Sequence, residues 1–92
     1  MSDSKLPIAE ANRSVEQQLL LTNLDTASIF MDIAATSKVE ETVRRNHANA
    51  RKAYDTVSRK RQLLKPDADQ HGAIKVKLAA LKARLQTVGQ QF

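Results

Sequence analysis

The four residues Ser37-Lys38-Val39-Glu40 decide the fold, because they have the S-x-x-E form of a capping box at a helix start. In such a box the serine hydroxyl accepts a hydrogen bond from a free amide of the first turn. The glutamate side chain accepts one from the serine amide. A helix before the box therefore has to end near Ala35 or Thr36. The link is so short that the two flanking helices are predicted to form an antiparallel hairpin.

Upstream of this box, a helix is predicted over about residues 8–35. It can begin at Pro7 or at Ser14-Val15-Glu16-Gln17, which is a second capping box. Apolar side chains recur every three or four residues and form one stripe along it: Leu20, Leu24, Ala27, Met31 and Ala34. Four more widen the apolar face to over half of the circumference: Val15, Leu19, Phe30 and Ile33. Asp25 and Asp32 are expected on the solvent side.

Downstream of the box, two more helices are predicted, over about residues 38–65 and 68–88. Pro66 is expected to end the first and Gly89 the second. The first has an apolar row with a period of seven: Val43, Ala50, Val57 and Leu64. The second has a stripe spaced four, three, four and three: Ile74, Leu78, Leu81, Leu85 and Val88. The predicted fold is all-α, a single domain over 1–92 that forms an antiparallel three-helix bundle, up-down-up with short loops.

The composition excludes several classes of function. Cysteine is absent from the 92 residues, so disulfides, thiolate zinc sites and cysteine nucleophiles are excluded. A chain of this length builds a deep active site with difficulty and carries no recognisable catalytic set, so no enzyme, cofactor or metal site is predicted. The first ten residues lack the apolar region of a secretion signal, and no apolar run approaches the roughly 20 residues that span a bilayer. A soluble, cytoplasmic protein is expected.

Charge is distributed by segment. Residues 1–37 carry a net charge of −3, whereas residues 38–65 carry +6. Adjacent basic pairs recur along the second helix: Arg44 and Arg45, Arg51 and Lys52, Arg59 and Lys60. Such a row can follow phosphates or an acidic protein, or it can be a solvated face partly balanced by the acids of the first helix. An anionic membrane surface is disfavoured, because large apolar anchors are missing beside the row.

Two further patterns favour structural interpretations. Asp67-Ala68-Asp69-Gln70-His71-Gly72 has the D-x-D-x-x-G form that opens a calcium-binding loop. The closing position of such a loop would be Leu78, where a bidentate glutamate is required, so a capped helix start is favoured. His47 and Tyr54 lie seven residues apart on the inward side of the second helix, where an interface role is favoured over catalysis.

The stretch Ala50-Arg51-Lys52-Ala53-Tyr54-Asp55-Thr56-Val57 resembles the second helix of a tetratricopeptide-type hairpin, in which a small residue precedes an aromatic one by four positions. Ala27 and Phe30-Met31 would face it from the first helix. The three-segment layout is also similar to small three-helix microtubule-interacting-and-trafficking domains, and the chain looks like small helical proteins of bacteria. The first two resemblances imply that a partner helix binds in a groove.

The predicted function is a non-catalytic protein–protein interaction module or small adaptor, with self-association left open. Phe30 and Ile33 are the predicted apolar contacts. The predicted contacts for an acidic partner are five basic side chains of the second helix: Arg44, Arg45, Arg51, Lys52 and Arg59. The alternative is a basic nucleic-acid-associated protein that binds phosphates through this helix. Steep loss of affinity with rising salt would distinguish phosphate binding from docking through apolar residues.

Overall fold

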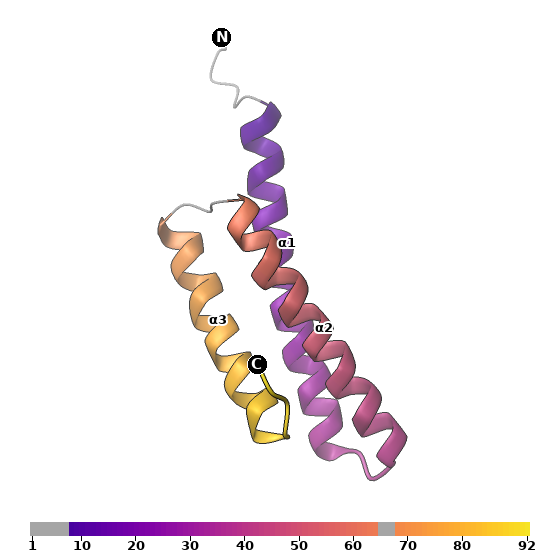
Figure 1. The fold of residues 1–92 in the computed structure, drawn as a ribbon. Helices are drawn as coiled ribbons and strands as arrows, with labels where there is room; N and C mark the ends of the chain where they lie inside the picture. Colours follow the sequence, from indigo (N-terminus) through magenta and orange to yellow (C-terminus); the bar gives the residue numbers. More distant parts are fainter. Residues whose placement is uncertain (1–7, 65–67) are drawn as a thin grey trace.

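The protein is an all-α bundle of three helices. The computed structural model describes the backbone of residues 8–64 and 68–92 and the side chains of residues 15–63 and 71–92. The helices are α1 (Ile8–Thr36), α2 (Glu40–Leu64) and α3 (Ala68–Thr87), each within two residues of its predicted bounds. The first two form an antiparallel hairpin, and α3 packs against both and runs parallel to α1 (Figure 1). The predicted three-helix bundle is confirmed.

Some predicted signals lie outside the described residues: Pro7, the side chains of Ser14 and Leu64, Pro66, Asp67 and the side chain of Asp69. None of the described helices combines the length and the apolar character that crossing a membrane requires.

The α1–α2 turn uses only half of the predicted capping box. The Ser37 hydroxyl accepts a hydrogen bond from the Val39 amide at 3.1 Å, as expected of a cap. The Ser37 amide, however, donates to the Ile33 carbonyl at 3.0 Å and so belongs to the last turn of α1. Because that amide is already used, the Glu40 carboxylate does not reach back to it and lies instead 3.7 Å from the Arg44 guanidinium. The predicted reciprocal bond is therefore wrong.

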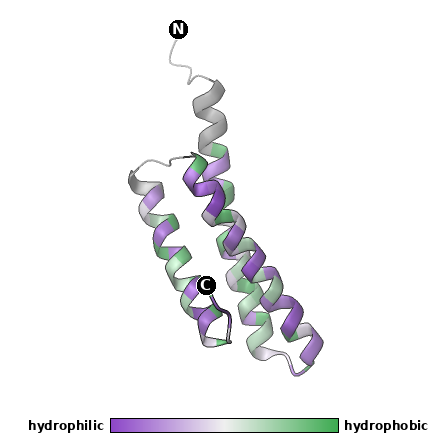
Figure 2. Cartoon of the chain, in the orientation of Figure 1, coloured by the Kyte–Doolittle hydropathy of each residue, from purple (hydrophilic) through white to green (hydrophobic). Residues whose placement is uncertain are grey.

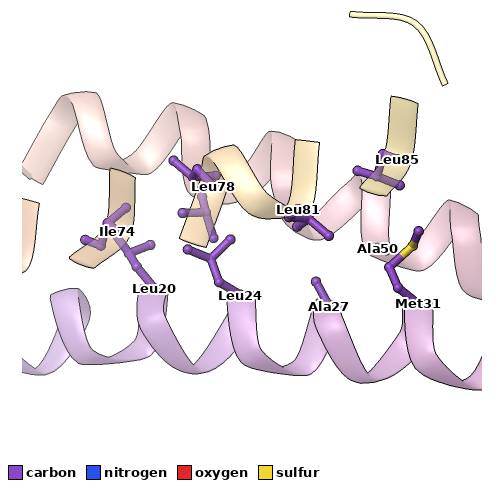
Figure 3. Packing of buried hydrophobic residues seen from close by; sticks show 10 residues of the cluster. Leu20, Leu24, Ala27, Met31, Ala50, Ile74, Leu78, Leu81 and Leu85 are labelled. Atoms are coloured by element: carbon purple, nitrogen blue, oxygen red, sulfur yellow. The ribbon is translucent and has the colours of Figure 1, made fainter. Parts of the chain in front are cut away.

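The hydrophobic core lies where the stripes of the three helices meet. It consists of ten buried residues: Leu20, Leu24, Ala27, Met31, Ala50, Val57, Ile74, Leu78, Leu81 and Leu85. The stripes of α1 and α3 share the spacing four, three, four, and because the helices run parallel, Ile74 lies beside Leu20 and Leu78 beside Leu24 (Figure 3). Shared spacing keeps the two stripes in register along the bundle.

Helix α2 contributes only small residues to the core. Ala50 and Val57 are its fully buried residues in the described part of the helix, and Ala53 and Tyr54 pack partly buried against the core. The small side chains of Ala50 and Ala53 let the α2 backbone approach its neighbours closely. Most of the core volume therefore comes from the leucine-rich stripes of α1 and α3.

Helix α3 ends in a Schellman motif at Gly89, the residue predicted to stop it. Gly89 has φ +97°, a backbone conformation that glycine adopts without the steric cost of a side chain. Its amide donates to the Gln86 carbonyl, and the Gln90 amide donates to the Leu85 carbonyl, both at 3.0 Å. Val88, which the spacing predicted in the core, is 42% exposed because the helix has already ended at Thr87. Gly89 turns the last residues back toward α2.

Two ion pairs join α1 to α3. The Lys77 ammonium lies 2.6 Å from the Asp25 carboxylate, and the Arg84 guanidinium lies 2.9 Å from the Asp32 carboxylate. Arg84 also donates a hydrogen bond to the Ser28 carbonyl at 3.3 Å. Asp25 and Asp32 lie on the solvent side, as expected, and both carboxylates pair with α3 and not with the basic face of α2.

The Asp32–Arg84 pair is expected to contribute little to stability. Both side chains are more than a third exposed, so water and salt screen their attraction. A double-mutant cycle of Asp32→Ala and Arg84→Ala, measured by urea unfolding, should give a coupling energy of about 0.2–1 kcal/mol at low salt. The coupling should shrink as salt is raised. A coupling that salt leaves unchanged would contradict the screened ion pair and indicate a contribution from buried contacts.

Candidate interaction surfaces on α1 and α2

The two predicted apolar contact residues differ in their surroundings. Phe30 is half-buried and packs against the hydrophobic core, whereas Ile33 is exposed at the end of α1. Phe30 therefore has a structural role within the bundle, and its contact with a partner stays a prediction. Ile33 belongs to a longer row of exposed residues along α1.

That row is a second stripe on α1, called here the outer stripe. It consists of six exposed residues: Val15, Leu19, Thr22, Thr26, Ile29 and Ile33. They are spaced four, three, four, three and four, which keeps them on one face of a helix. The four aliphatic members are 60%, 54%, 55% and 43% exposed in chain order. The described residues of α2 and α3 leave these side chains exposed.

Sequence reasoning found part of the outer stripe and missed the rest. Val15, Leu19 and Ile33 were recognised only as extra width of the apolar face, and Ile29 was not singled out. The whole outer stripe could have been found from heptad spacing, by testing the residues of this helix that do not belong to the buried stripe and by counting its threonines as well as its aliphatic residues. An ordinary solvent-facing side of a helix does not repeat large aliphatic residues at this interval.

A hollow between α1 and α2 adjoins the outer stripe. It has a volume of about 410 Å³ and is lined by Glu16, Leu19, Leu20, Asn23, Lys60 and Leu63. Leu63 is 76% exposed, the largest exposure among the large apolar residues of the described part of the chain. Because Leu19 belongs to both features, the exposed apolar surface continues from the outer stripe across to the end of α2. Glu16 and Lys60 place one charge of each sign in the lining.

Half of the six residues of the predicted basic row form ion pairs within α2, a helix with more hydrophilic residues than α1 (Figure 2). Arg44 lies 3.7 Å from the Glu40 carboxylate and Arg45 lies 3.5 Å from that of Glu41. Both pairs connect adjacent turns of α2 and are well exposed, so they weaken the positive charge at the start of α2 and add little to its stability.

Arg51 fixes the chain end against α2. Its guanidinium donates to the Gln91 carbonyl at 2.7 Å and to the Gln90 side chain at 3.3 Å, and it lies 3.1 Å from the Asp55 carboxylate. It also stacks on the Phe92 ring, with its central carbon 4.0 Å from the ring centroid. These contacts give Arg51 a structural role. The sequence did not predict them, because Arg51 and the chain end are about forty positions apart.

The Phe92 ring completes this contact. It meets the Tyr54 ring edge to face, with centroids 4.9 Å apart at 73°. The Lys82 ammonium lies 5.4 Å from the same ring centroid. Tyr54 therefore joins the core to the chain end, which agrees with the interface role that its position on α2 indicated.

Three residues of the predicted basic row remain exposed outside these contacts: Lys52, Arg59 and Lys60. Lys60 lines the hollow beside Leu19. Lys52 and Arg59 line a shallow hollow of about 500 Å³ on α2, which also includes Arg51, Asp55 and Gln90. Neither forms an ion pair with any residue of the described part of the chain. The basic surface available to a partner is therefore narrower than the sequence suggested.

His47 lies half-buried in a third hollow, of about 240 Å³, together with Met31, Arg84 and Val88. A catalytic base needs a group that orients it and a substrate within reach. The charged neighbour in this lining is the Arg84 guanidinium, which cannot accept a hydrogen bond from a histidine. The arrangement fits a histidine at a helix interface.

The calcium-loop pattern is described only in part, because Asp67 and the side chain of Asp69 lie outside the described residues. Among the described residues, no three histidine or carboxylate side chains gather closely enough to hold a metal ion. Leu78, which occupies the closing position of the calcium-loop pattern, is buried in the core. Its burial agrees with the interpretation of that pattern as a helix start.

The chain matches no family model, and neither a curated protein nor a solved structure is significantly similar to it.

Proposed function

We propose that the protein is a non-catalytic interaction module that receives an apolar helix on the outer stripe of α1. The observation that carries this proposal is the exposure of Val15, Leu19, Ile29 and Ile33 at heptad spacing along one face of one helix. Large contiguous apolar surface exposed on a small protein is typical of interaction sites.

A helix is the partner structure that matches this spacing. Residues that alternate by three and four positions form the knobs and holes of helix-on-helix packing. From Val15 to Ile33 the stripe is about 27 Å long at the 1.5 Å rise of an α-helix, enough for about five turns of a partner. An extended strand repeats every second residue and would align with few of these side chains.

Energy considerations require the partner to be apolar as well. Full burial of one aliphatic side chain contributes about 1.5–3 kcal/mol, and these four are about half exposed, so covering them contributes about 3–6 kcal/mol. Association costs at least about 4 kcal/mol of lost freedom. The outer stripe alone therefore supports only weak binding, and an apolar stripe on the partner has to supply the rest.

The test is the double variant Ile29→Lys/Ile33→Lys, compared with the matched control Val39→Lys/Val76→Lys. Both change two exposed aliphatic residues into lysine, but the control residues lie outside the outer stripe. The Ile33 change also places a cation in the last turn of α1, where the helix dipole favours it. In the control, the Val39 change places a cation directly before α2, where the helix dipole disfavours it by about 0.3–1 kcal/mol. Melting temperatures close to that of the wild type would show that both variants keep the fold.

The measurement is affinity capture from cell lysate by the wild type and by each variant, at near-physiological salt after nuclease treatment. The wild type and the control are expected to retain the same discrete protein, which can be a second copy of this chain. The outer-stripe variant should lose it. Capture that all three proteins share equally would contradict docking on this face.

The competing function, phosphate binding through α2, has two observations in its favour. Lys52 and Arg59 are exposed, and Asp25 and Asp32 pair with α3 instead of neutralising α2. It predicts that nuclease removes the captured material and that Lys52→Glu/Arg59→Glu abolishes binding to a nucleic-acid duplex. Affinity for the duplex would also fall steeply with salt, as counterion release requires.

A further inference from the structure

We infer that the helix received by the outer stripe is α1 of a second copy, packed antiparallel across a two-fold axis near the level of residue 24. This inference rests on the proposed function, because it names the partner of the same surface. The order of the stripe residues along the chain carries it.

The outer stripe has the same order of residue kinds, aliphatic or threonine, when it is followed in either direction along the chain. Counted outward from position 24, a threonine stands two positions away on each side, and an aliphatic residue stands five and nine positions away on each side. The pairs related in this way are Thr22 with Thr26, Leu19 with Ile29 and Val15 with Ile33. A two-fold interface requires that if one residue contacts another, the second also contacts the first in return. Every two-fold pair of identical chains meets that requirement, and in an antiparallel pair centred at position 24 each reciprocal contact of the outer stripe also joins two residues of the same kind.

Each layer of the pair is also chemically matched. At both ends an aliphatic side chain of one copy meets an aliphatic side chain of the other, and the threonine hydroxyls meet in the middle, where they can bond to each other. Pairing of this kind places no charge in the seam. This arrangement, with aliphatic residues at both ends and threonines in the middle, is matched by a second copy of α1, whereas a helix of unrelated sequence would match it only by coincidence.

The rest of the fold leaves room for the second copy. Helix α3 is tied to α1 through Asp25 and Asp32, and it packs on the buried stripe at Leu20 and Leu24. The outer stripe lies on another side of α1 and is exposed along its length. Leu63, across the hollow from Leu19, extends the apolar surface that the second copy would meet.

Net charge predicts the sign of the salt dependence. Each copy carries a formal net charge of +5, so two copies repel each other at low salt. Salt screens this repulsion and strengthens apolar association. Self-association should therefore become tighter as salt rises, whereas binding to an acidic protein or to a nucleic acid should become weaker.

The first experiment is sedimentation equilibrium of the full chain from micromolar to millimolar concentration, at low and high salt. A monomer–dimer equilibrium is expected whose dissociation constant falls as salt rises. At high salt, Ile29→Lys/Ile33→Lys should raise that constant at least about a hundredfold, since two buried aliphatic contacts become charged. Val39→Lys/Val76→Lys adds the same net charge outside the stripe, so at high salt, where repulsion is screened, it should leave the constant nearly unchanged. A wild-type chain that stays monomeric throughout would overturn the inference.

Disulfide trapping tests the direction of packing, and the absence of native cysteine makes it unambiguous. Leu19→Cys mixed with Ile29→Cys should form a cross-linked dimer under mild oxidation, and each variant alone should not. In a two-fold antiparallel pair, position 19 of one copy lies about 15 Å along the axis from position 19 of the other, since ten residues separate positions 19 and 29. Cross-linking of Leu19→Cys with itself would overturn the antiparallel arrangement in favour of a parallel one.

The two proposals fail in different ways. A monomer that still captures another protein through the outer stripe would overturn the second copy as partner and leave the interaction module standing. A monomer whose capture does not depend on the outer stripe would overturn both.

Discussion

Leu24→Ala is expected to lower the free energy of unfolding by about 2–5 kcal/mol. Leu24 is 1% exposed and packs between α1 and α3 beside Leu78 (Figure 3). The change removes apolar contacts and leaves a cavity. Because α1 and α3 also pack against each other above and below this position, they cannot easily move together to close it. A chain of this length has a total stability of about 5–14 kcal/mol, so the loss is a large part of it. Urea unfolding followed by far-UV circular dichroism measures the change.

The matched control for this prediction is Leu63→Ala. It removes the same atoms from a side chain that is 76% exposed, so the free energy of unfolding should change by no more than about 0.5 kcal/mol. Equal losses in the two variants would mean that Leu24 does not lie in a packed core. The difference between the two unfolding free energies therefore tests the burial pattern directly.

Ala50→Leu is expected to destabilise the bundle by about 1–3 kcal/mol, although leucine is the more hydrophobic residue. Ala50 is completely buried where α2 packs against α1, so three further carbon atoms have to enter a packed core. The larger side chain forces the helices apart or takes a strained rotamer, and either outcome costs packing energy. The measurement is the urea midpoint, with the slope of the transition as a check on two-state behaviour.

Ala79→Leu on the exposed side of α3 is the control for the overpacking prediction. Both substitutions have nearly the same intrinsic effect on helix formation, because alanine and leucine are both strong helix formers. The control should leave the midpoint almost unchanged. An Ala50→Leu variant as stable as the wild type would show that α1 and α2 are not closely packed at this point.

The sequence predicted those parts of the fold that depend on local spacing. The stripes of α1 and α3, the short turn at Ser37 and the stop at Gly89 all follow from signals within a few residues of one another. Such signals depend on the helical period and on the conformation of single residues. They therefore predict where a helix lies and ends without knowledge of the helix that it packs against. The buried positions Leu20, Leu24 and Leu81 were predicted on this basis and are confirmed.

The candidate sites were predicted less well. Spacing identified Arg51 as a basic surface residue, but the chain end turns back at Gly89 and binds it through Gln91 and Phe92. Spacing also grouped Phe30 with Ile33 as an apolar contact, whereas the core partly covers Phe30 and leaves Ile33 exposed. In both cases a segment distant in sequence changes the exposure of the side chain.

The sequence by itself determined three helices, their order and the stripe that each one buries, because these depend on contacts between residues three and four positions apart. Only the tertiary structure decided that Asp25 and Asp32 pair with α3 and that the outer stripe of α1 stays uncovered. Those outcomes depend on the rotation of each helix about its axis and on its register against its neighbours. Several rotations satisfy the same apolar pattern, and the packing of side chains across all three helices selects one of them.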